Sequence, residues 1–503
     1  MPLFAYMDPG RLILLLALTS FLGLMNHPSP VTAFTTPISQ PSLQQQSFVQ
    51  SDQPPSSMNH SHFTSPPTTN SSLDQLLLEK KQECSTTNYL LRQTTSPDLP
   101  DDTSDSILPG TTEVLMYPTW ASNSMYDVND GYHAYIHGVV FKRHKPSFLN
   151  RIIIKAFIKH YGSTNPEEKQ RLEGRLSYFF ADHSKHKTKV STVDDISLSG
   201  STYRLPHLIP DSDGHFETES TPLPSAPYLP GDIVELQVRL PSSNRPFYGR
   251  CHLYGPTGWS ILTDIDDTIK DTRVPKYNKM FRKAFMEKYE AIPGMVELFQ
   301  YLSVKLATQA APDVGFHYIS GTPFSLMPSL DRWLKRSNFP SGPLQLAKFR
   351  IKDPSTLYNL PQYVQFKVTE MTRVRRYFPH RKFILFGDSG QGDERAYAQL
   401  MKGEGGDSFQ CMFIRLVSGV DEATEYELNR LERWITSLSD IPQTRWRLFR
   451  DPKELYNIDI AGGKCHPDED HAAILADMEA QKGMLVSEVT RIINSPALPL
   501  SSP

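Results

Sequence analysis

The sequence predicts an α/β protein in which a Rossmann-like parallel sheet domain follows a smaller, mostly β domain. Two observations support this prediction. From about residue 258 to residue 450, short apolar runs alternate with longer segments of helical periodicity, which is typical of a parallel sheet covered by helices on both faces. From residue 113 to residue 257, runs rich in β-branched and aromatic residues are separated by Gly and Pro turn signals.

Composition limits the kinds of partner. The chain has 503 residues, enough for two or three domains, and a net charge of −3. No global field therefore steers it towards nucleic acid, and we expect no nucleic-acid partner; any basic surface must be local. Apolar residues make up only 39% of the chain and prolines number 41, so we expect part of it to be unfolded.

Residues 1–33 are predicted to be a signal peptide or, as a second interpretation, an uncleaved signal anchor. The apolar run Leu12–Met25 is shorter than the roughly 20 residues of a membrane span but fits a signal-peptide core, and Val31–Ala33 offers a small-residue cleavage site. An incorrectly assigned start codon is a third possibility. The secretory route would make glycosylation sequons of Asn59 and Asn70, although such triplets also arise by chance in a Ser/Thr-rich segment.

Residues 34–107 are rich in Ser, Thr, Pro, Gln and Asn, and they predict a disordered linker, since such a segment buries too little apolar surface to offset its ordering entropy. At the other end, residues 451–503 are predicted to be a partly disordered C-terminal extension. The four cysteines lie far apart, without metal-ligand spacing, so we expect neither a zinc site nor a disulfide framework, and interpret them as ordinary thiols: Cys84, Cys251, Cys411 and Cys465.

The β domain is expected to contain at least one inserted helix, in the segment "SFLNRIIIKAFIKHYG". Its apolar residues have helical periodicity, with Arg151, Lys155 and Lys159 spaced four apart. A helix that packs its apolar face on the β domain is the favoured interpretation, because globular helices commonly have this composition. Binding to an anionic lipid surface is the alternative.

Three sites in the second domain place polar residues directly after an apolar strand. They are Asp264-Ile-Asp266-Asp267-Thr268, Ser320-Gly321-Thr322 and Asp388-Ser389-Gly390, with Asp393 five residues after Asp388 and Lys367 between the second and third sites. Because ligands bind at the carboxyl ends of parallel strands, these side chains are expected to meet. Each site alone has a simpler explanation: an acidic helix-capping turn, a strand-to-helix turn with Thr322 as N-cap and Pro323 at N1, and an acidic helix start at Asp393.

The order DxDxT, Ser, Lys and GDxxxxD resembles the haloacid dehalogenase-type phosphotransferases. The segments "SILTDIDDTIKDTRV", "HYISGTPFSLMPSL" and "FPHRKFILFGDSGQGDERAY" resemble more closely the actin-patch phosphatidate phosphatase family, over roughly residues 113–415. The "LMYPTW" and "PGM" segments fit that family too. Two positions depart from the expected pattern: Gly321 stands where Asn is expected and Glu394 where Pro is expected, which leaves specificity open.

The resemblance implies a Mg²⁺-dependent phosphatase, because a hard cation with oxygen ligands offsets the repulsion between a carboxylate and a phosphate dianion. Asp264 is then the nucleophile, and Asp266 the general acid and base, whose carbonyl also binds the metal. Asp388 completes the metal site and Asp393 binds the metal directly or supports it. Ser320 and Lys367 bind the phosphoryl oxygens, and Thr268 supports the loop. Asp267 is assigned to structure or to metal support, while Asp271 and Thr272 are assigned to the loop.

The predicted function is hydrolysis of phosphatidate to diacylglycerol and phosphate, with a lipid phosphate at a membrane surface as substrate. One alternative is the same chemistry on a soluble phosphoester or a phosphoprotein. Another is an adaptor for cytoskeletal or endocytic proteins that has little activity, although the intact Asp264, Asp266 and Asp388 argue against it. Localisation stays undecided, because the N-terminal segment indicates the secretory route or a membrane anchor, whereas the family resemblance implies cytoplasmic actin patches.

Overall fold

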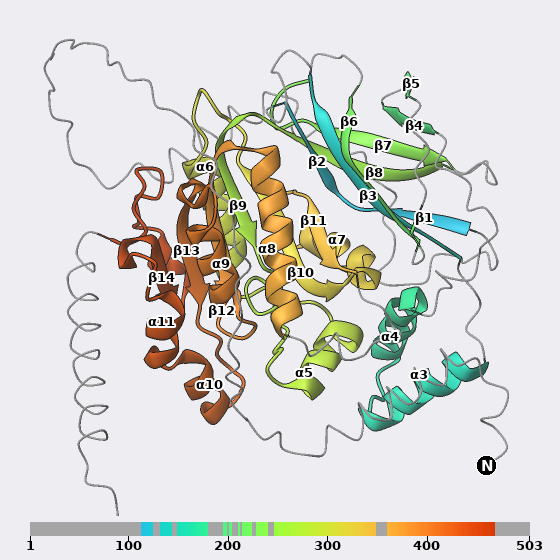
Figure 1. Ribbon diagram of the computed structural model, residues 1–503. Coiled ribbons are helices and arrows are strands. Elements are labelled where there is room, and N and C mark those ends of the chain that lie inside the picture. The colour runs from blue at the N-terminus through green and yellow to red at the C-terminus, as the bar shows by residue number, and fades with distance from the viewer. Residues whose placement is uncertain are drawn as a thin grey trace, which may run out of the picture. The chain divides into compact units, whose positions relative to one another are not determined.

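The computed structural model describes residues 112–123, 131–142, 148–179, 195–198, 201–203, 210–211, 214–223, 228–239, 246–348 and 360–467. These ranges belong to one compact unit that contains two sheets (Figure 1). The predicted signal segment, linker and sequons lie outside the described residues. Within the described ranges, no helix is both long enough and apolar enough to cross a membrane.

A six-stranded parallel sheet forms the centre of the second half of the chain. Its order is β11-β10-β9-β12-β13-β14, which is the 3-2-1-4-5-6 order of a doubly wound sheet. Successive strands are added towards one edge from β9 to β11 and towards the other edge from β12 to β14, so the carboxyl ends of β9 and β12 flank the switch point. The strands are β9 (Thr257–Thr263), β10 (Gly315–Pro323), β11 (Leu344–Ala347), β12 (His380–Asp388), β13 (Phe409–Arg415) and β14 (Trp446–Phe449).

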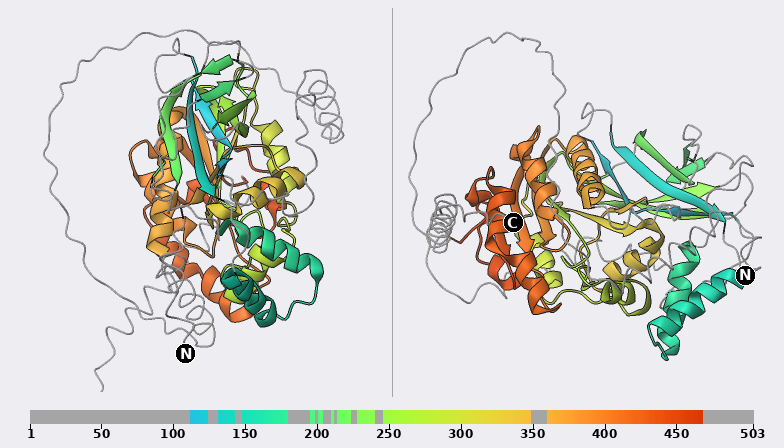
Figure 2. Two further views of the ribbon diagram at one scale, coloured as in Figure 1. Left: turned by 90° about the vertical axis from the view of Figure 1, so that its right-hand side faces the viewer. Right: turned by 60° about the horizontal axis from the view of Figure 1, so that its bottom comes forward.

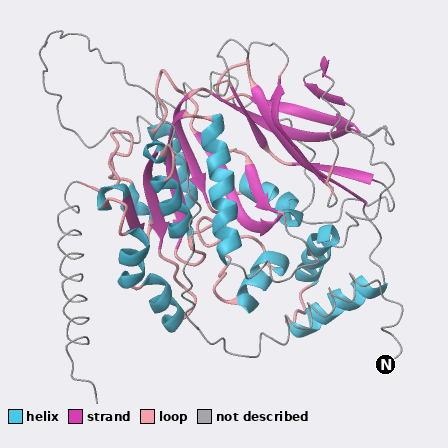
Figure 3. Ribbon diagram, in the orientation of Figure 1, coloured by secondary structure: helices cyan, strands magenta, loops and turns pink. Residues whose placement is uncertain are grey.

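Helices cover both faces of this sheet (Figure 3). Successive side chains of a strand point to opposite faces, so they contribute to two separate hydrophobic cores. On β9, Ile261 belongs to the core of one face and Leu262 to that of the other. The Ile261 face is covered by α6 (Met295–Lys305) and α7 (Met327–Arg336). The Leu262 face is covered by α8 (Leu360–Tyr377), α9 (Asp393–Lys402) and α11 (Leu431–Leu438). The predicted alternation of strands and helices is therefore present.

Short elements connect these layers. Gly294 is the N-cap of α6 with φ of 83°, a left-handed conformation that favours glycine, and a Cβ there would also lie 3.3 Å from the Pro452 ring. The short elements are α5 (Tyr277–Phe281), η2 (Arg282–Met286), η3 (Phe324–Leu326), η5 (Gly406–Ser408), α10 (Glu422–Asn429), η6 (Gln443–Arg445) and η7 (Pro452–Leu455).

The first sheet is mostly antiparallel, and β2 pairs with β8 in the parallel direction. Its last strand, β8, runs through the turn at Gly255–Pro256 directly into β9, so the N-terminal sheet continues into the central strand of the parallel one. The strands are β1 (Thr112–Met116), β2 (Thr119–Ser122), β3 (His133–Lys142), β4 (Asp195–Leu198), β5 (Ser201–Tyr203), β6 (His215–Pro222), β7 (Ile233–Arg239) and β8 (Pro246–Tyr254).

The two sheets share buried side chains. Tyr117 and Val139 of the first sheet lie in the core of the Ile261 face, and Trp120 and Tyr135 lie in that of the Leu262 face. Hydrogen bonds join the sheets as well: the Leu344 amide donates to the Pro118 carbonyl at 3.0 Å, and the Ser122 hydroxyl donates to the Tyr377 carbonyl at 2.7 Å. The β sheet is therefore packed firmly against β11 and the end of α8.

The buried apolar side chains described for the basic helical segment pack on helices, so for these side chains the favoured interpretation, which placed them on the β domain, was wrong. The chain forms two helices here, α3 (Phe148–His160) and α4 (Pro166–Phe179), which lie beside α5 and η2 (Figure 2). Ile154 and Phe157 of α3 share a core with α4 and with Phe281 and Met286. Arg171 of α4 donates to the Met286 carbonyl at 2.7 Å. Ile154 and Phe157 of α3 are thus covered by helical neighbours.

The core also continues beyond the boundary predicted at residue 450. Leu455, Ile458 and Ile460 are buried in the Ile261-face core. Cys465 forms a disulfide with Cys411 of β13, with the two Cα atoms 5.6 Å apart and 54 residues apart in sequence. The prediction of ordinary thiols was therefore wrong for these two cysteines, whereas Cys251 is a buried free thiol.

Candidate active site

Two of the four aspartates predicted for the metal site lie at the switch point of the parallel sheet. Asp264 directly follows β9 and Asp388 is the last residue of β12, its neighbour. The Asp264 amide donates to the Phe386 carbonyl at 2.9 Å, which extends the pairing of the two strands to Asp264. Both side chains are therefore held by the rigid ends of buried strands.

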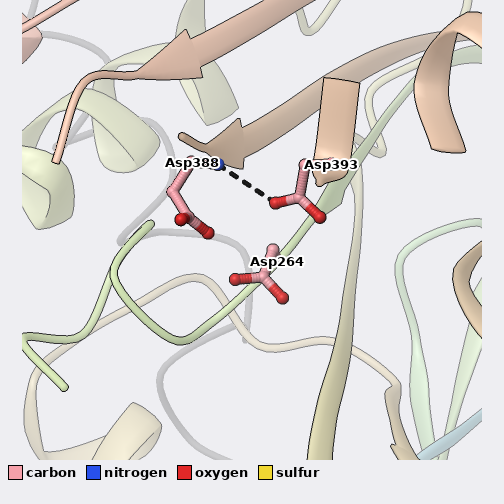
Figure 4. A group of neighbouring side chains, drawn as sticks. All are labelled: Asp264, Asp388 and Asp393. Atoms are coloured by element: carbon pink, nitrogen blue, oxygen red, sulfur yellow. Dashed lines mark hydrogen bonds between the residues drawn. The ribbon is translucent and has the colours of Figure 1, made fainter. Parts of the chain in front are cut away.

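Asp393, the first residue of α9, completes a group of three carboxylates with Asp264 and Asp388 (Figure 4). One oxygen of each lies within 4.8 Å of the others, and all three residues are fully buried. The Asp388 amide donates to Asp393 Oδ2 at 3.0 Å, so this contact fixes the start of α9 against the end of β12. The strand-end motifs thus bring together three of the four aspartates that the sequence assigned to the metal site, while the Asp266 carboxylate lies outside the group.

Lys367 of α8 lies against this group. Its Nζ is 2.8 Å from Asp264 Oδ1 and also pairs with Asp393 Oδ1. Burial would lower the pKa of Lys367, but the fields of Asp264, Asp393 and Asp388 outweigh it, and the pKa lies above the ordinary value. The lysine is therefore a permanent cation among the carboxylates.

One lysine cannot balance three buried carboxylates. Burial raises the pKa of Asp264 in spite of Lys367, and burial together with the charges of Asp393 and Asp264 raises the pKa of Asp388. With all three carboxylates ionised, the group and Lys367 would carry an excess of two negative charges, and a group made only of oxygen donors with that charge fits a divalent, hard cation such as Mg²⁺. The residues present therefore fit the predicted metal, with Asp264, Asp388 and Asp393 as carboxylate ligands.

Asp266 occupies a separate hydrogen-bonded pocket, and its carboxylate is outside the group of three. Its Oδ1 pairs with Lys270 Nζ at 2.6 Å and accepts from the Thr272 hydroxyl at 2.7 Å. Its Oδ2 accepts from the Ser320 hydroxyl at 2.9 Å and from the Thr322 hydroxyl. Burial would raise the pKa of Asp266, but Lys270 and these hydroxyls outweigh burial and hold it well below its usual range.

Of two predictions near Asp266, one was incomplete and one was wrong. Thr272 lies in the loop, as predicted, but it is 2% exposed and its hydroxyl donates to Asp266. Thr322 was considered as an N-cap, but β10 continues through Pro323 and the Thr322 hydroxyl donates to Asp266 instead. Lys270, which pairs with Asp266, was not singled out by the sequence.

Thr268 and Asp267 shape the loop after β9. The Thr268 hydroxyl lies 3.2 Å from Asp264 Oδ2 and 3.4 Å from Asp388 Oδ2, so it links the two strand-end carboxylates. Asp267 has a left-handed φ of 60°, and its carboxylate accepts the backbone N–H groups of Thr272, Arg273 and Val274 at 3.0, 2.6 and 2.7 Å. These bonds stabilise a conformation that costs of order 1–3 kcal/mol in isolation.

The two unexpected residues have structural explanations. The Tyr363 ring fills the space beside Gly321, because a Cβ built on Gly321 would lie 2.5 Å from it. Glu394 is fully buried and accepts from Arg433 Nη2 of α11 at 2.8 Å. Arg433 also donates to the Ser389 carbonyl, so Glu394 ties α9 and α11 to the loop after Asp388.

The doubly wound sheet and its buried carboxylates define an α/β domain with a candidate cation site at the switch point. Residues 259–416 match a family model described as "Phosphatidate phosphatase APP1, catalytic domain". This segment is therefore similar to a phosphatidate phosphatase catalytic domain, and the resemblance predicted from the motifs is confirmed for it. The N-terminal sheet, which the prediction included from residue 113, lies outside the matched residues.

Two curated relatives match a similar share of the chain. One is Phosphatidate phosphatase APP1 of Saccharomyces cerevisiae, 32% identical over 145 residues, and the other is an uncharacterized protein of Schizosaccharomyces pombe, 28% identical over 149 residues. Each alignment covers 28% of this chain and 23% of the relative. The chain therefore matches about a quarter of the length of each relative.

Proposed function

We propose that the protein is a Mg²⁺-dependent phosphatase of the haloacid dehalogenase-like type that hydrolyses phosphatidate to diacylglycerol and phosphate. The observation that most directly supports this proposal is the group of three buried carboxylates with a single lysine, which lies within the segment that matches the phosphatase family. Asp264, Asp388 and Asp393 would hold the cation. When bound, Mg²⁺ would offset the negative charge of the phosphate beside these carboxylates.

Asp264 is the proposed nucleophile. Its carboxylate oxygen attacks phosphorus, the bond between phosphorus and the ester oxygen breaks, and the phosphoryl group becomes an aspartyl-phosphate on Asp264. Lys367, whose Nζ is 2.8 Å from Asp264, binds a phosphoryl oxygen and stabilises the charge that develops there. Water then attacks the aspartyl-phosphate, which releases phosphate and restores Asp264.

Asp266 is the proposed proton carrier. It gives a proton to the leaving alkoxide in the first step and accepts one from the attacking water in the second. Lys270 and three hydroxyl donors keep Asp266 ionised in this structure, which is the form required for the second step. We expect the acid form to become accessible when the substrate phosphate adds negative charge beside it, because a nearby like charge raises the pKa of a carboxyl group.

Phosphate release from purified full-length protein tests this proposal. With short-chain soluble phosphatidate and Mg²⁺, wild type should release phosphate, EDTA should abolish release and added Mg²⁺ should restore it. Asp264→Asn should lose activity, whereas Asp407→Asn, the same change at a fully exposed aspartate of η5, should keep it. Equal release by wild type and Asp264→Asn would sink the proposal.

The choice of substrate has its own comparison. Faster release from phosphatidate than from soluble phosphoesters or a phosphopeptide would support the lipid substrate, and the reverse order would favour the soluble alternative. Long-chain phosphatidate in mixed micelles, compared with the short-chain form in solution, would show whether a lipid surface assists. Cytoskeletal and endocytic partners stay a prediction from the family resemblance.

A further inference from the structure

A cavity of about 290 Å³ lies between the two sheets. Its walls come from β3 and β6 of the first sheet, from the end of β11 and from the first four turns of α8. Figure 1 shows α8 in front of β10 and beside the β sheet. This volume is at the lower end of the range for small-molecule sites, roughly 300–1,000 Å³, so it accommodates part of a ligand.

Two contacts make this cavity a neighbour of the candidate phosphoryl site. Leu346, on the cavity wall, is paired in the sheet with Ser320, whose hydroxyl contacts Asp266. Tyr363, also on the wall, lies against Gly321. Lys367, which contacts Asp264, is one helical turn after Tyr363 and so lies on the same side of α8. A ligand bound at Asp264 could therefore extend past Tyr363 into the cavity.

The walls suit an apolar group. Leu346, Ala347, Phe366 and the rings of Tyr135 and Tyr363 supply carbon surface. His137 is stacked on Tyr117, and burial lowers its pKa, so this wall residue is neutral near pH 7.

The charged wall residues are paired with one another. Arg373 pairs with Glu370 at 2.6 Å, and the more exposed Lys348 pairs with Glu217 at 3.2 Å. The cavity therefore combines apolar walls with ion pairs that already neutralise its charged side chains. A second phosphate would find no excess of positive charge among these four residues.

We propose that this cavity binds an acyl-chain segment of the lipid phosphate whose phosphoryl group lies at Asp264. The inference rests on the proposed function and specifies where the apolar part of the leaving group is held. Gly321 is a positioning residue in this account, because the absence of a side chain there makes room for the ring of Tyr363, which lines the cavity. The chain length that fits the cavity then influences which substrates react.

A cavity-filling variant tests the proposal by chain-length preference. Ala347→Phe places a ring at the cavity wall, and Ala310→Phe places the same ring at an exposed position before the amino end of β10, as a matched control. We expect the ratio of kcat/KM for dioctanoyl phosphatidate to that for dibutyryl phosphatidate to fall about 10-fold in Ala347→Phe, a typical effect of one lost methylene-sized contact. An Ala347→Phe ratio equal to that of wild type and Ala310→Phe would overturn the proposal.

Photo-cross-linking tests the cavity proposal on the wild-type protein. It measures binding alone, so it depends neither on the folding of a variant nor on catalytic turnover. A phosphatidate with a photoreactive diazirine at the end of one acyl chain is irradiated with full-length wild type, and the labelled peptides are identified by mass spectrometry. We expect label on β11 or α8, suppressed by unlabelled dioctanoyl phosphatidate. Label that appears only elsewhere, for example on α3, would overturn the cavity proposal. The proposed function is tested separately by phosphate release, so the failure of one proposal can be told from the failure of the other.

Discussion

Replacing Lys270 with methionine removes the cation that holds Asp266 ionised. Lys270 Nζ lies 2.6 Å from Asp266 Oδ1, and the two side chains are 2% and 8% exposed. Methionine has a similar length but no charge, so the change leaves a buried carboxylate without its ion pair. We expect Lys270→Met to destabilise the folded protein and to raise the pKa of Asp266, because burial then dominates.

Breaking a buried ion pair by removing one partner costs about 3–5 kcal/mol of unfolding free energy. The hydroxyls of Thr272, Ser320 and Thr322 still donate to Asp266 in the variant, so we expect a loss at the lower end, about 3 kcal/mol. In wild type the lowered pKa of Asp266 stabilises the fold above the ordinary carboxyl pKa of about 3.9, and this contribution is lost as the pH falls. The variant's Asp266 binds a proton more readily, so the difference in unfolding free energy between the two proteins should shrink as the pH falls from neutral towards the ordinary carboxyl pKa of about 3.9.

Urea unfolding of the two proteins at several pH values measures this difference. Lys335→Met is the matched control, since Lys335 pairs with Asp331 at the same four-residue spacing but is 48% exposed, and its loss should cost less than about 1 kcal/mol. Equal losses in Lys270→Met and Lys335→Met, without dependence on pH, would refute the argument.

Two further predictions concern stability away from the site. Cys465→Ser removes the disulfide to Cys411, which closes a 54-residue loop, and chain entropy gives an upper estimate of about 4 kcal/mol for the loss of unfolding free energy. A reducing agent should cause a similar loss in wild type. An unchanged unfolding free energy in both experiments would contradict the disulfide. Arg381→Met leaves Asp313 buried without the guanidinium 2.9 Å away, so the urea midpoint should fall by the equivalent of about 3–5 kcal/mol, and an unchanged midpoint would count against the pair.

The position of the main carboxylates could be predicted because two local signals agree. Apolar runs identify β9 and β12 as buried strands, and the carboxyl ends of parallel strands are where polar ligand groups collect. Asp264 and Asp388 therefore followed from the order of elements. Lys367 followed only through the family resemblance, because a single lysine in a helical pattern carries no such signal.

The partners of Asp266 could not be predicted, since they depend on how the loop after β9 turns back. The Lys270 amide donates to the Ile265 carbonyl at 2.9 Å, and this return brings Lys270 and Thr272 to the carboxylate. No periodic pattern encodes such a turn. The Cys411–Cys465 disulfide was missed for a related reason: sequence separation says nothing about proximity when the chain between passes through α10, α11 and β14.

The central claim is that Asp264 carries the phosphoryl group during turnover. Rapid acid quenching of the protein with short-chain phosphatidate and Mg²⁺, followed by peptide mapping, tests it most directly. The account predicts a hydroxylamine-sensitive phosphate on the peptide that contains Asp264, present in wild type and missing in Asp264→Asn. Phosphate release at full rate with no phosphate on that peptide, or with phosphate on another residue, would contradict it.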